Sequence, residues 1–259
     1  MIVPKIVFED PQILVIDKPS GLVVNRAESV REETVQDWTE KKFAIRNSQF
    51  EITSDFVRRA GIVHRLDKEA SGLLVIAKTL LAFENLKAQF KERQVKKKYL
   101  ALVHGKIESS EGEIILPIKR LPWDRKKFGI IPGGKKSRTK FKVVANYQLS
   151  RYSTQSVDIE NPRHKVSGLI TNYTLLEASP ITGRTHQIRV HFKHLGHPLV
   201  GDLKYSGRRV KKDQKFCPRL FLHAIYICFV HPQTNKKIEF KSLLPQDLEK
   251  TLQGLNKAE

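Results

Sequence analysis

The chain has 259 residues, with 47 lysines and arginines against 27 aspartates and glutamates, so its formal net charge is +20. At 40% hydrophobic residues it can bury a sizeable core, which excludes a disordered basic tail. Two cysteines exclude a disulfide-framed scaffold and a four-cysteine zinc site, and without a signal peptide or membrane-length apolar run we expect a cytoplasmic protein with no membrane partner.

The apolar pattern predicts more strands than helices. Strands are expected over residues 13–16, 62–66, 73–77, 99–103, 113–118, 141–145, 173–178 and 220–230. Helices are expected to start at 34, to span 80–91 and 185–195, and to start again at 245. Because most strands follow one another without a crossover helix, this order favours an α+β protein with a largely antiparallel sheet. The basic loops 119–140 and 204–216 and the polar stretch 151–170 are interpreted as insertions within a single domain over 1–259.

The basic residues are clustered along the chain. Residues 87–98, 119–142 and 204–215 carry net charges of +5, +9 and +5, nearly the whole excess. Such clusters are typical of a nucleic-acid binder, although a solvated surface that keeps the protein soluble would look similar. We expect Lys135, Lys136 and Arg138 to contact backbone phosphates of the nucleic acid.

Several familiar sites are missing from the sequence. It contains no phosphate-binding GxxxxGK[ST] loop, no dinucleotide glycine fingerprint, and no HExxH or CxxC pair. Histidines occur at 186, 191, 194 and 197, but their spacing gives a poor zinc face on a helix. We therefore expect no metal and no small-molecule cofactor.

Two stretches could carry chemistry. In Gly61–Lys78, the carboxylate of Asp67 stands among basic residues at the end of a predicted strand. An acid in a polyanion-binding face costs affinity, which suggests a function, but an aspartate that caps its own turn is an equal alternative on spacing alone. In Thr182–His191, two arginines stand at a helix entered through a glycine turn, a good site for a phosphate or carboxylate.

These stretches closely resemble the signatures of the RluA-type pseudouridine synthases. The family's His-Arg-Leu-Asp motif and the Ser-Gly-Leu-Leu run after it stand at 64–74, and its Gly-Arg-Thr-His-Gln-Ile-Arg-Val-His motif stands at 183–191. Further matching blocks lie at 16–24, 98–105, 196–202 and 222–224, so the resemblance runs from about residue 8 to 250 in the family's order. Ala70 departs from the family's usual threonine, and we expect no separate small N-terminal RNA-binding domain of the kind that many members carry.

The resemblance implies the pseudouridine synthase fold with a central active-site cleft, and an enzyme that isomerises uridine in RNA. By similarity Asp67 is the essential carboxylate, which either attacks the nucleoside or removes a ribose proton. Arg189 is its ion-pair partner, and a nearby cation keeps such a carboxylate ionised. Tyr99 resembles the tyrosine that stacks on the flipped base and assists proton removal.

The resemblance assigns further residues to substrate binding. Arg65 resembles the arginine that fills the space left by the flipped uridine, and Ile227 is expected to pack on the other face of the base. His64 and Arg184 are expected to orient the motif or to hold phosphate. The partner is ribosomal or transfer RNA, the protein is expected to be a monomer, and the target uridine stays open. A non-catalytic RNA-binding module or RNA chaperone derived from such an enzyme is the alternative function.

Overall fold

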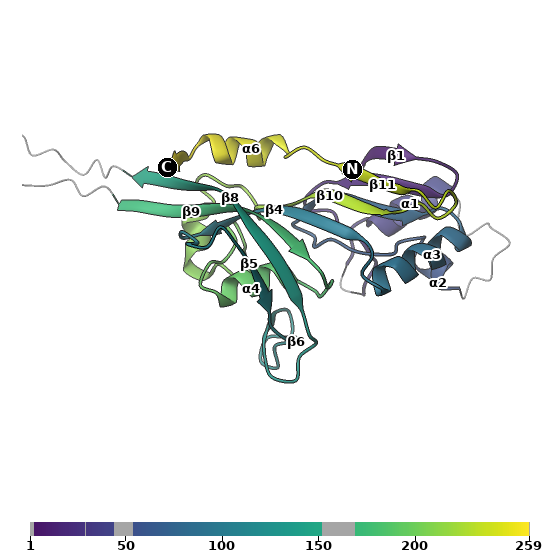
Figure 1. The fold of residues 1–259 in the computed structure, drawn as a ribbon, viewed down its shortest axis with the longest axis horizontal. Coiled ribbons are helices and arrows are strands. Elements are labelled where there is room, and N and C mark those ends of the chain that lie inside the picture. The colour runs from purple at the N-terminus through teal and green to yellow at the C-terminus, as the bar shows by residue number, and fades with distance from the viewer. Residues whose placement is uncertain (1–2, 29, 44–53, 152–168, 259) are drawn as a thin grey trace, which may run out of the picture.

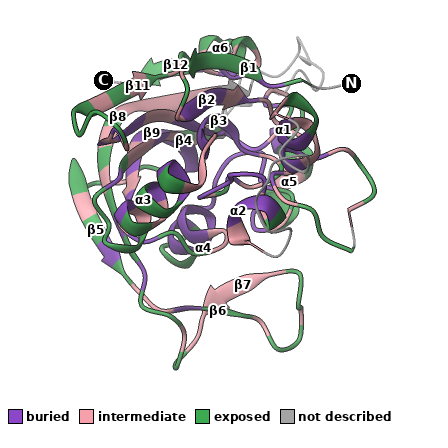
Figure 2. Ribbon diagram, turned by 90° about the vertical axis from the view of Figure 1, so that its right-hand side faces the viewer, coloured by how far each residue is buried: buried purple, intermediate pink, exposed green. Residues whose placement is uncertain are grey.

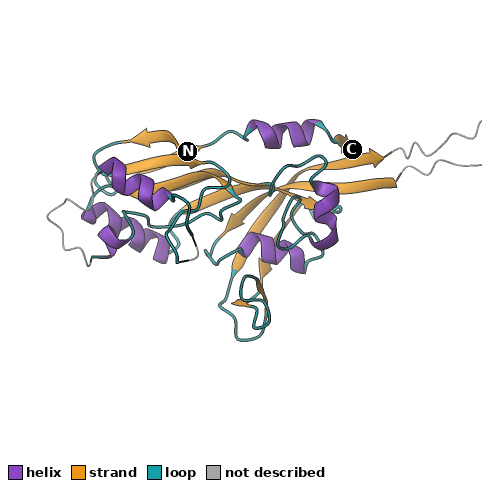
Figure 3. Ribbon diagram, turned by 180° about the vertical axis from the view of Figure 1, so that it is seen from behind, coloured by secondary structure: helices purple, strands orange, loops and turns teal. Residues whose placement is uncertain are grey.

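A ten-stranded sheet runs through the computed structural model, which describes residues 3–28, 30–43, 54–151 and 169–258. Its strands follow the order β1-β2-β3-β10-β4-β9-β8-β12, with β11 beside β10 and β5 beside β8. All pairs are antiparallel except β3 with β10. Figure 3 shows these strands as one continuous twisted layer with helices against it. The predicted α+β class with a largely antiparallel sheet is confirmed.

The elements have the following bounds. The strands are β1 (Lys5–Glu9), β2 (Ile13–Lys18), β3 (Ser71–Ala77), β4 (Lys96–His104), β5 (Glu111–Ile115), β6 (Ile118–Arg120), β7 (Phe128–Ile130), β8 (Arg138–Arg151), β9 (Leu169–Pro180), β10 (Leu222–Val230), β11 (Lys237–Lys241) and β12 (Asn256–Ala258). The helices are α1 (Val35–Phe43), α2 (Asp55–Arg58), α3 (Leu80–Lys91), α4 (Gln187–His194), the 3-10 turn η2 (Gly207–Arg209), α5 (Val210–Asp213) and α6 (Gln246–Gln253). None of the described helices is long and apolar enough to cross a membrane.

Alternating strand residues build separate cores on the two faces of the sheet. On one face, even-numbered β2 residues such as Leu14 pack with α1 and α4. On the other, Ile13 and Val15 pack with α2 and α3, and Leu102 of β4 packs with α6. Figure 1 places α6 and α4 on opposite sides of the sheet. Figure 2 shows buried residues in the central strands, whereas β5 and α6 expose much of their surface.

Local signals explain where several helices begin and end. The Thr34 hydroxyl accepts the Asp37 N–H (3.1 Å) and the Asp37 carboxylate accepts the Thr34 N–H (2.8 Å), a reciprocal cap that starts α1. At the C-terminal end of α4, Gly196 has a φ of +84°, and this left-handed conformation ends the helix that was predicted over residues 185–195.

The strand predicted over residues 62–66 is wrong. Only Ile62 joins the sheet, through an isolated bridge to Ile76. Beyond it, the Nε2 atom of His64 accepts the N–H of Val75 at 3.0 Å, so a side chain takes the place of a backbone partner. The chain is therefore free to leave the sheet and form the loop that carries Asp67.

Two of the segments interpreted as loops contain regular structure. Residues 119–140 include most of the β6–β7 hairpin, which projects from the sheet on the side of α4 (Figure 1). Residues 204–216 include η2 and α5. These interpretations were wrong because the density of charge and glycine concealed short elements. Of the third segment, residues 152–168 lie outside the described residues.

Candidate active site

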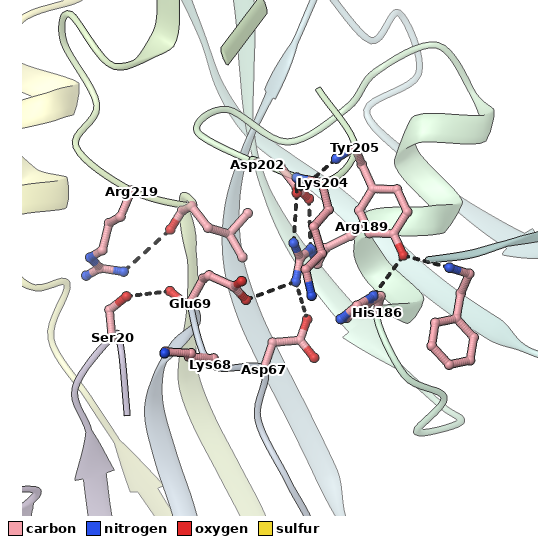
Figure 4. A network of polar contacts seen from close by, with 12 residues as sticks. Ser20, Asp67, Lys68, Glu69, His186, Arg189, Asp202, Lys204, Tyr205 and Arg219 are labelled. Carbon is pink, nitrogen blue, oxygen red and sulfur yellow. Dashed lines mark hydrogen bonds and ion pairs between the residues drawn. The ribbon is translucent and has the colours of Figure 1, made fainter. Parts of the chain in front are cut away.

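The loop carrying Asp67 is anchored by the turn that follows β2. The N–H of Gly21 donates to the Lys68 carbonyl at 2.8 Å, and the Ser20 hydroxyl donates to the Glu69 carbonyl at 2.7 Å (Figure 4). Gly21 has a φ of +89°, a conformation that side chains disfavour. The N-terminal block of the sequence therefore positions a carboxylate about 50 residues further along the chain.

Lys18 reinforces this anchor from inside the protein. Its ammonium group is fully buried and donates to the carbonyls of Pro19 (2.8 Å), Leu22 (2.9 Å) and Lys68 (3.3 Å). Burial lowers the pKa of Lys18 to about 7, although the charge of nearby Asp67 opposes this shift. Lys18 thus ties the turn to the Asp67 loop through backbone oxygens.

The sheet closes tightly behind the same loop. Gly72 of β3 pairs in parallel with Ala224 of β10, and a Cβ on Gly72 would lie 2.4 Å from the Ala224 carbonyl oxygen. Beside it, the Ser71 hydroxyl lies 2.9 Å from Nδ1 of His223. The Ser-Gly and Leu-His-Ala blocks, 150 residues apart in the sequence, therefore meet here and require these small residues.

Arg189 of α4 lies at the centre of a buried charge network. Its guanidinium, 1% exposed, donates from Nε and Nη2 to the two carboxylate oxygens of Asp202, both at 2.8 Å (Figure 4). Its Nη1 donates to Asp67 Oδ2 at 3.0 Å and to Glu69 Oε2 at 3.3 Å. Burial acts to lower the pKa of Arg189, but the hydrogen bonds and charge of Asp202 together with the charges of Asp67 and Glu69 raise that pKa on balance, so the cation is permanent.

A cavity lies in front of Asp67. It is lined by the Asp67 loop, by β4, by the end of β9 and the turn into α4, and by the start of β10, with Arg65, Leu66, Asp67, Ala70, Lys97, Tyr99, Pro180, Thr182, Gly183, Arg184, Thr185, His186, Gln187, Ile188, Arg189 and Leu222. The phenol of Tyr99 is 8% exposed, and burial, with the charge of Asp67 added, raises its pKa above the ordinary value. The cavity thus combines an ionisable carboxylate, a fixed cation and an aromatic ring.

The β6–β7 hairpin is tied to the rim of this cavity. The Tyr205 hydroxyl accepts the Phe128 N–H at 3.0 Å and lies 2.7 Å from Nδ1 of His186 (Figure 4). His186 has a φ of 55° at the start of α4. Burial lowers its pKa to about 4, against the opposing charge of Asp67, so the ring is neutral at pH 7. A basic hairpin is thereby fixed beside the active-site helix.

The structure brings together five of the seven residues predicted for catalysis or substrate binding. Asp67, Tyr99, Arg189, Arg65 and Arg184 all line the cavity, although they come from three separate motifs. Their individual roles stay predictions. The cavity lining also includes Leu222, from the Leu-His-Ala block, which the sequence analysis had quoted but given no role.

His64 and Ile227 lie apart from the cavity. The His64 ring stacks on Phe90 with centroids 4.6 Å apart, and its Nε2 is occupied by the Val75 N–H. Ile227, 1% exposed, packs with Phe229 in the core on the face opposite Tyr99. Neither residue is among those that line the cavity.

The three predicted phosphate contacts also lie outside the cavity lining. Lys135 and Lys136 are exposed, and Lys135 pairs through its backbone with Ile118 at the base of the hairpin. Arg138 differs from the two lysines because its guanidinium donates two hydrogen bonds to the carboxylate of Glu113 on β5, and the bond from Nη2 is 2.8 Å long. The charge of Arg138 is therefore already offset by a protein partner.

Three further residues belong to this region but were not predicted from the sequence: Glu69 and Asp202, which bind Arg189, and Lys97, which lines the cavity. Asp202 lies in the matching block 196–202, and an acidic residue directly after Gly201 was the feature that could have marked it as a site residue. Glu69 and Lys97 were hidden among charged neighbours. Among the described residues, no group of three or more histidine, cysteine or carboxylate side chains could hold a metal ion.

Comparison with known proteins defines the class. Residues 12–194 match the family model described as RNA pseudouridylate synthase, so the chain belongs to this family of isomerases and the family predicted from the sequence is confirmed. The chain is 37% identical over 257 residues to "Ribosomal large subunit pseudouridine synthase D" of Nitrosomonas europaea, covering 97% of this chain and 65% of that protein. It is 34% identical over 255 residues to "Ribosomal large subunit pseudouridine synthase C" of Vibrio parahaemolyticus, covering 98% and 70%.

A solved structure supports the same assignment. "Human RNA Pseudouridylate Synthase Domain Containing 1" superposes with a TM-score of 0.69 at 26% identity, covering 99% of this chain and 89% of that one. The pseudouridine synthase fold predicted from the sequence is therefore confirmed. The chain spans about two thirds of the length of the bacterial relatives.

Proposed function

We propose that the protein isomerises uridine to pseudouridine in RNA of the large ribosomal subunit, with Asp67 as the essential carboxylate. The observation that carries this proposal is the contact between Asp67 and the buried Arg189 (3.0 Å) at the edge of a cavity that also contains Tyr99. The names of the bacterial relatives support a large-subunit substrate. Both cysteines are free and buried, in keeping with action in the cytoplasm.

The reaction breaks the bond between N1 of uracil and the ribose and forms a bond from C5 to the same carbon. C5 loses its proton and N1 gains one, so substrate and product are isomers and no redox partner is needed. In the proposed mechanism Asp67 acts on the nucleoside as a nucleophile or a base, and Arg189 orients the carboxylate through its 3.0 Å bond. Tyr99 stacks on the base after the uridine has left its helix.

The described chain is proposed to act as one catalytic domain. Strands β1 and β12, from its two ends, belong to the same sheet. The RNA backbone contacts are then made by the surface of this domain, where basic residues such as Lys135 and Lys136 are exposed. Such contacts position the RNA without reading its sequence.

Tritium release tests the function. Large-subunit ribosomal RNA labelled at C5 of uracil releases tritium only when C5 loses its hydrogen. We expect release by the parent protein and none by Asp67→Asn, which keeps the shape of the side chain but removes the charge. Asp247→Asn is the matched control, because Asp247 also pairs with an arginine, Arg219, but lies outside the cavity.

The outcome also separates the two functional classes. A parent protein that binds this RNA but releases no tritium would be a non-catalytic RNA-binding module. Release by Asp67→Asn at the parental rate would show that Asp67 only shapes its turn.

A further inference from the structure

Lys97 is a cation in the cavity that the proposed mechanism leaves unused. It stands two residues before Tyr99 on β4, and both residues line the cavity. A Cβ on Gly183 would lie 3.9 Å from Lys97 Nζ. The ammonium group therefore lies against the turn that leads into α4.

No described residue neutralises this charge. Lys97 takes part in none of the ion pairs between described residues, and its recorded contact is with the Phe90 ring, 5.6 Å from Nζ to centroid. Its neighbour Lys98 pairs with Glu177 at 3.0 Å. Burial alone lowers the pKa of Lys97 to about 8, since no carboxylate opposes the shift. An ammonium group withdrawn from water without an anionic partner costs free energy that a bound anion would recover.

Lys18, which is fully buried whereas Lys97 is partly buried, shows how an ammonium group with hydrogen-bond partners is held in this fold. Lys18 donates to three backbone carbonyls and holds a turn together. The structure shows no hydrogen bond from Lys97 to a described residue. A structural role like that of Lys18 therefore does not explain why the Lys97 side chain is partly buried. A cavity-lining lysine whose ammonium group has no hydrogen-bond or ion-pair partner can bind an anionic ligand.

The surroundings of Lys97 favour an anion. Arg65 and Arg184 line the same cavity and are exposed. Gly183 has no side chain, which leaves the approach to Nζ open. His64 cannot compete as a cation, since burial first, and then the charge of Lys97, lower its pKa well below the ordinary value.

RNA carries its negative charge on its phosphates, and a nucleotide of the RNA chain whose ribose is bound at Asp67 has a phosphate group on each side of that ribose. We propose that Lys97 binds a phosphate group of the nucleotide whose base enters the cavity. This inference rests on the proposed function, because it assumes that the nucleotide is the uridine to be isomerised. It makes Lys97 a substrate-positioning residue that holds the ribose relative to Asp67.

Small ligands test the inference without turnover. Uridine 3′,5′-bisphosphate carries the base, the ribose and both phosphates of a flipped nucleotide, and uridine is its phosphate-free counterpart. Calorimetric titration at low salt gives the affinity of each ligand for the parent, Lys97→Met, Lys97→Arg and Lys98→Met. Lys98 is the matched control, because it is adjacent in sequence but paired with Glu177.

We expect Lys97→Met to bind the bisphosphate at least about tenfold more weakly than the parent, the loss of one charge-assisted hydrogen bond, and to bind uridine within twofold of the parent. Lys97→Arg should keep the preference for the bisphosphate, because a guanidinium also binds phosphate. Lys98→Met should behave as the parent does.

Three results would overturn the inference. The parent protein could bind the bisphosphate no more tightly than uridine, Lys97→Met could retain the preference, or Lys97→Met could weaken both ligands equally, as a merely structural lysine would. Failure of the proposed function looks different. In that case the parent releases no tritium from ribosomal RNA, whatever the preference for the bisphosphate.

Discussion

Replacing Asp202 by asparagine would test whether the buried network around Arg189 stabilises the fold. Asp202 is fully buried and does not line the cavity. Its carboxylate accepts two bonds from Arg189, both at 2.8 Å, and the N–H groups of Lys204 (2.9 Å) and Tyr205 (3.1 Å). Asparagine keeps the volume and can still accept from both backbone N–H groups, but its amide nitrogen would then face the guanidinium, donor against donor.

The cost follows from this geometry. The variant loses a charge-assisted bond and the bidentate neutralisation of an arginine that is 1% exposed. Breaking a buried ion pair by removing one partner costs about 3–5 kcal/mol. For a protein of about this size, each kcal/mol lowers Tm by roughly 2–4 °C, so we expect Tm to fall by about 6–20 °C.

Thermal and urea unfolding of Asp202→Asn would measure this loss, with Glu113→Gln as the matched control. Glu113 also binds an arginine, Arg138, through two bonds, but the two side chains are 26% and 46% exposed. An exposed pair contributes about 0–1 kcal/mol, so the control should lose little. Equal losses in the two variants, or a fall in Tm under 2 °C for Asp202→Asn, would refute the idea that Arg189 depends on Asp202.

Three further outcomes are expected. Arg189→Lys should release tritium far more slowly than the parent, because one ammonium group cannot reproduce the guanidinium's contacts to three carboxylates; parental kinetics would remove Arg189 from the site. Neutralising Lys135 and Lys136 together should make the slope of log RNA affinity against log salt concentration shallower by about 1.4–1.8 units. Adding Arg138→Gln should change this slope little, because Glu113 already binds Arg138. A double variant with the parental slope would mean that the RNA does not contact these lysines. Because the pKa of His186 falls from 6.5 to about 4 on folding, the unfolded chain binds more protons between these pH values, and the free energy of unfolding should drop by up to about 3 kcal/mol from pH 6.5 to pH 4. His186→Asn, in which asparagine tolerates the left-handed backbone, should weaken this pH dependence in urea titrations. An identical pH profile for the variant and the parent would contradict the prediction.

Much of the fold could be predicted from the sequence, because its signals are local. The spacing of Leu80, Phe83 and Leu86 predicted α3, and the cap at Thr34 marked the start of α1. The prediction failed at residues 62–66, which have the composition of a strand. There the ladder position beside β3 is occupied by the side chain of His64, a contact across 11 residues that no local pattern contains.

The site divides in the same way. The motifs themselves brought Asp67, Tyr99 and Arg189 forward as candidates, and the structure places all three on one cavity. Ile227 was chosen from the right strand but on the wrong face, and Leu222 lines the cavity instead. The two residues pack in different cores, which only the pairing of β10 with its neighbouring strands decides.

By itself the sequence determined the chemistry that this protein can offer: an acid among basic residues, an arginine at the start of a helix, a basic surface and a family signature. Only the tertiary structure decided which charges are satisfied. Arg189 is neutralised by Asp202, Arg138 by Glu113, and Lys97 by no described residue. The physical reason is that pairing depends on distances of 3–4 Å between residues far apart in the chain, and those distances exist only once the sheet has formed.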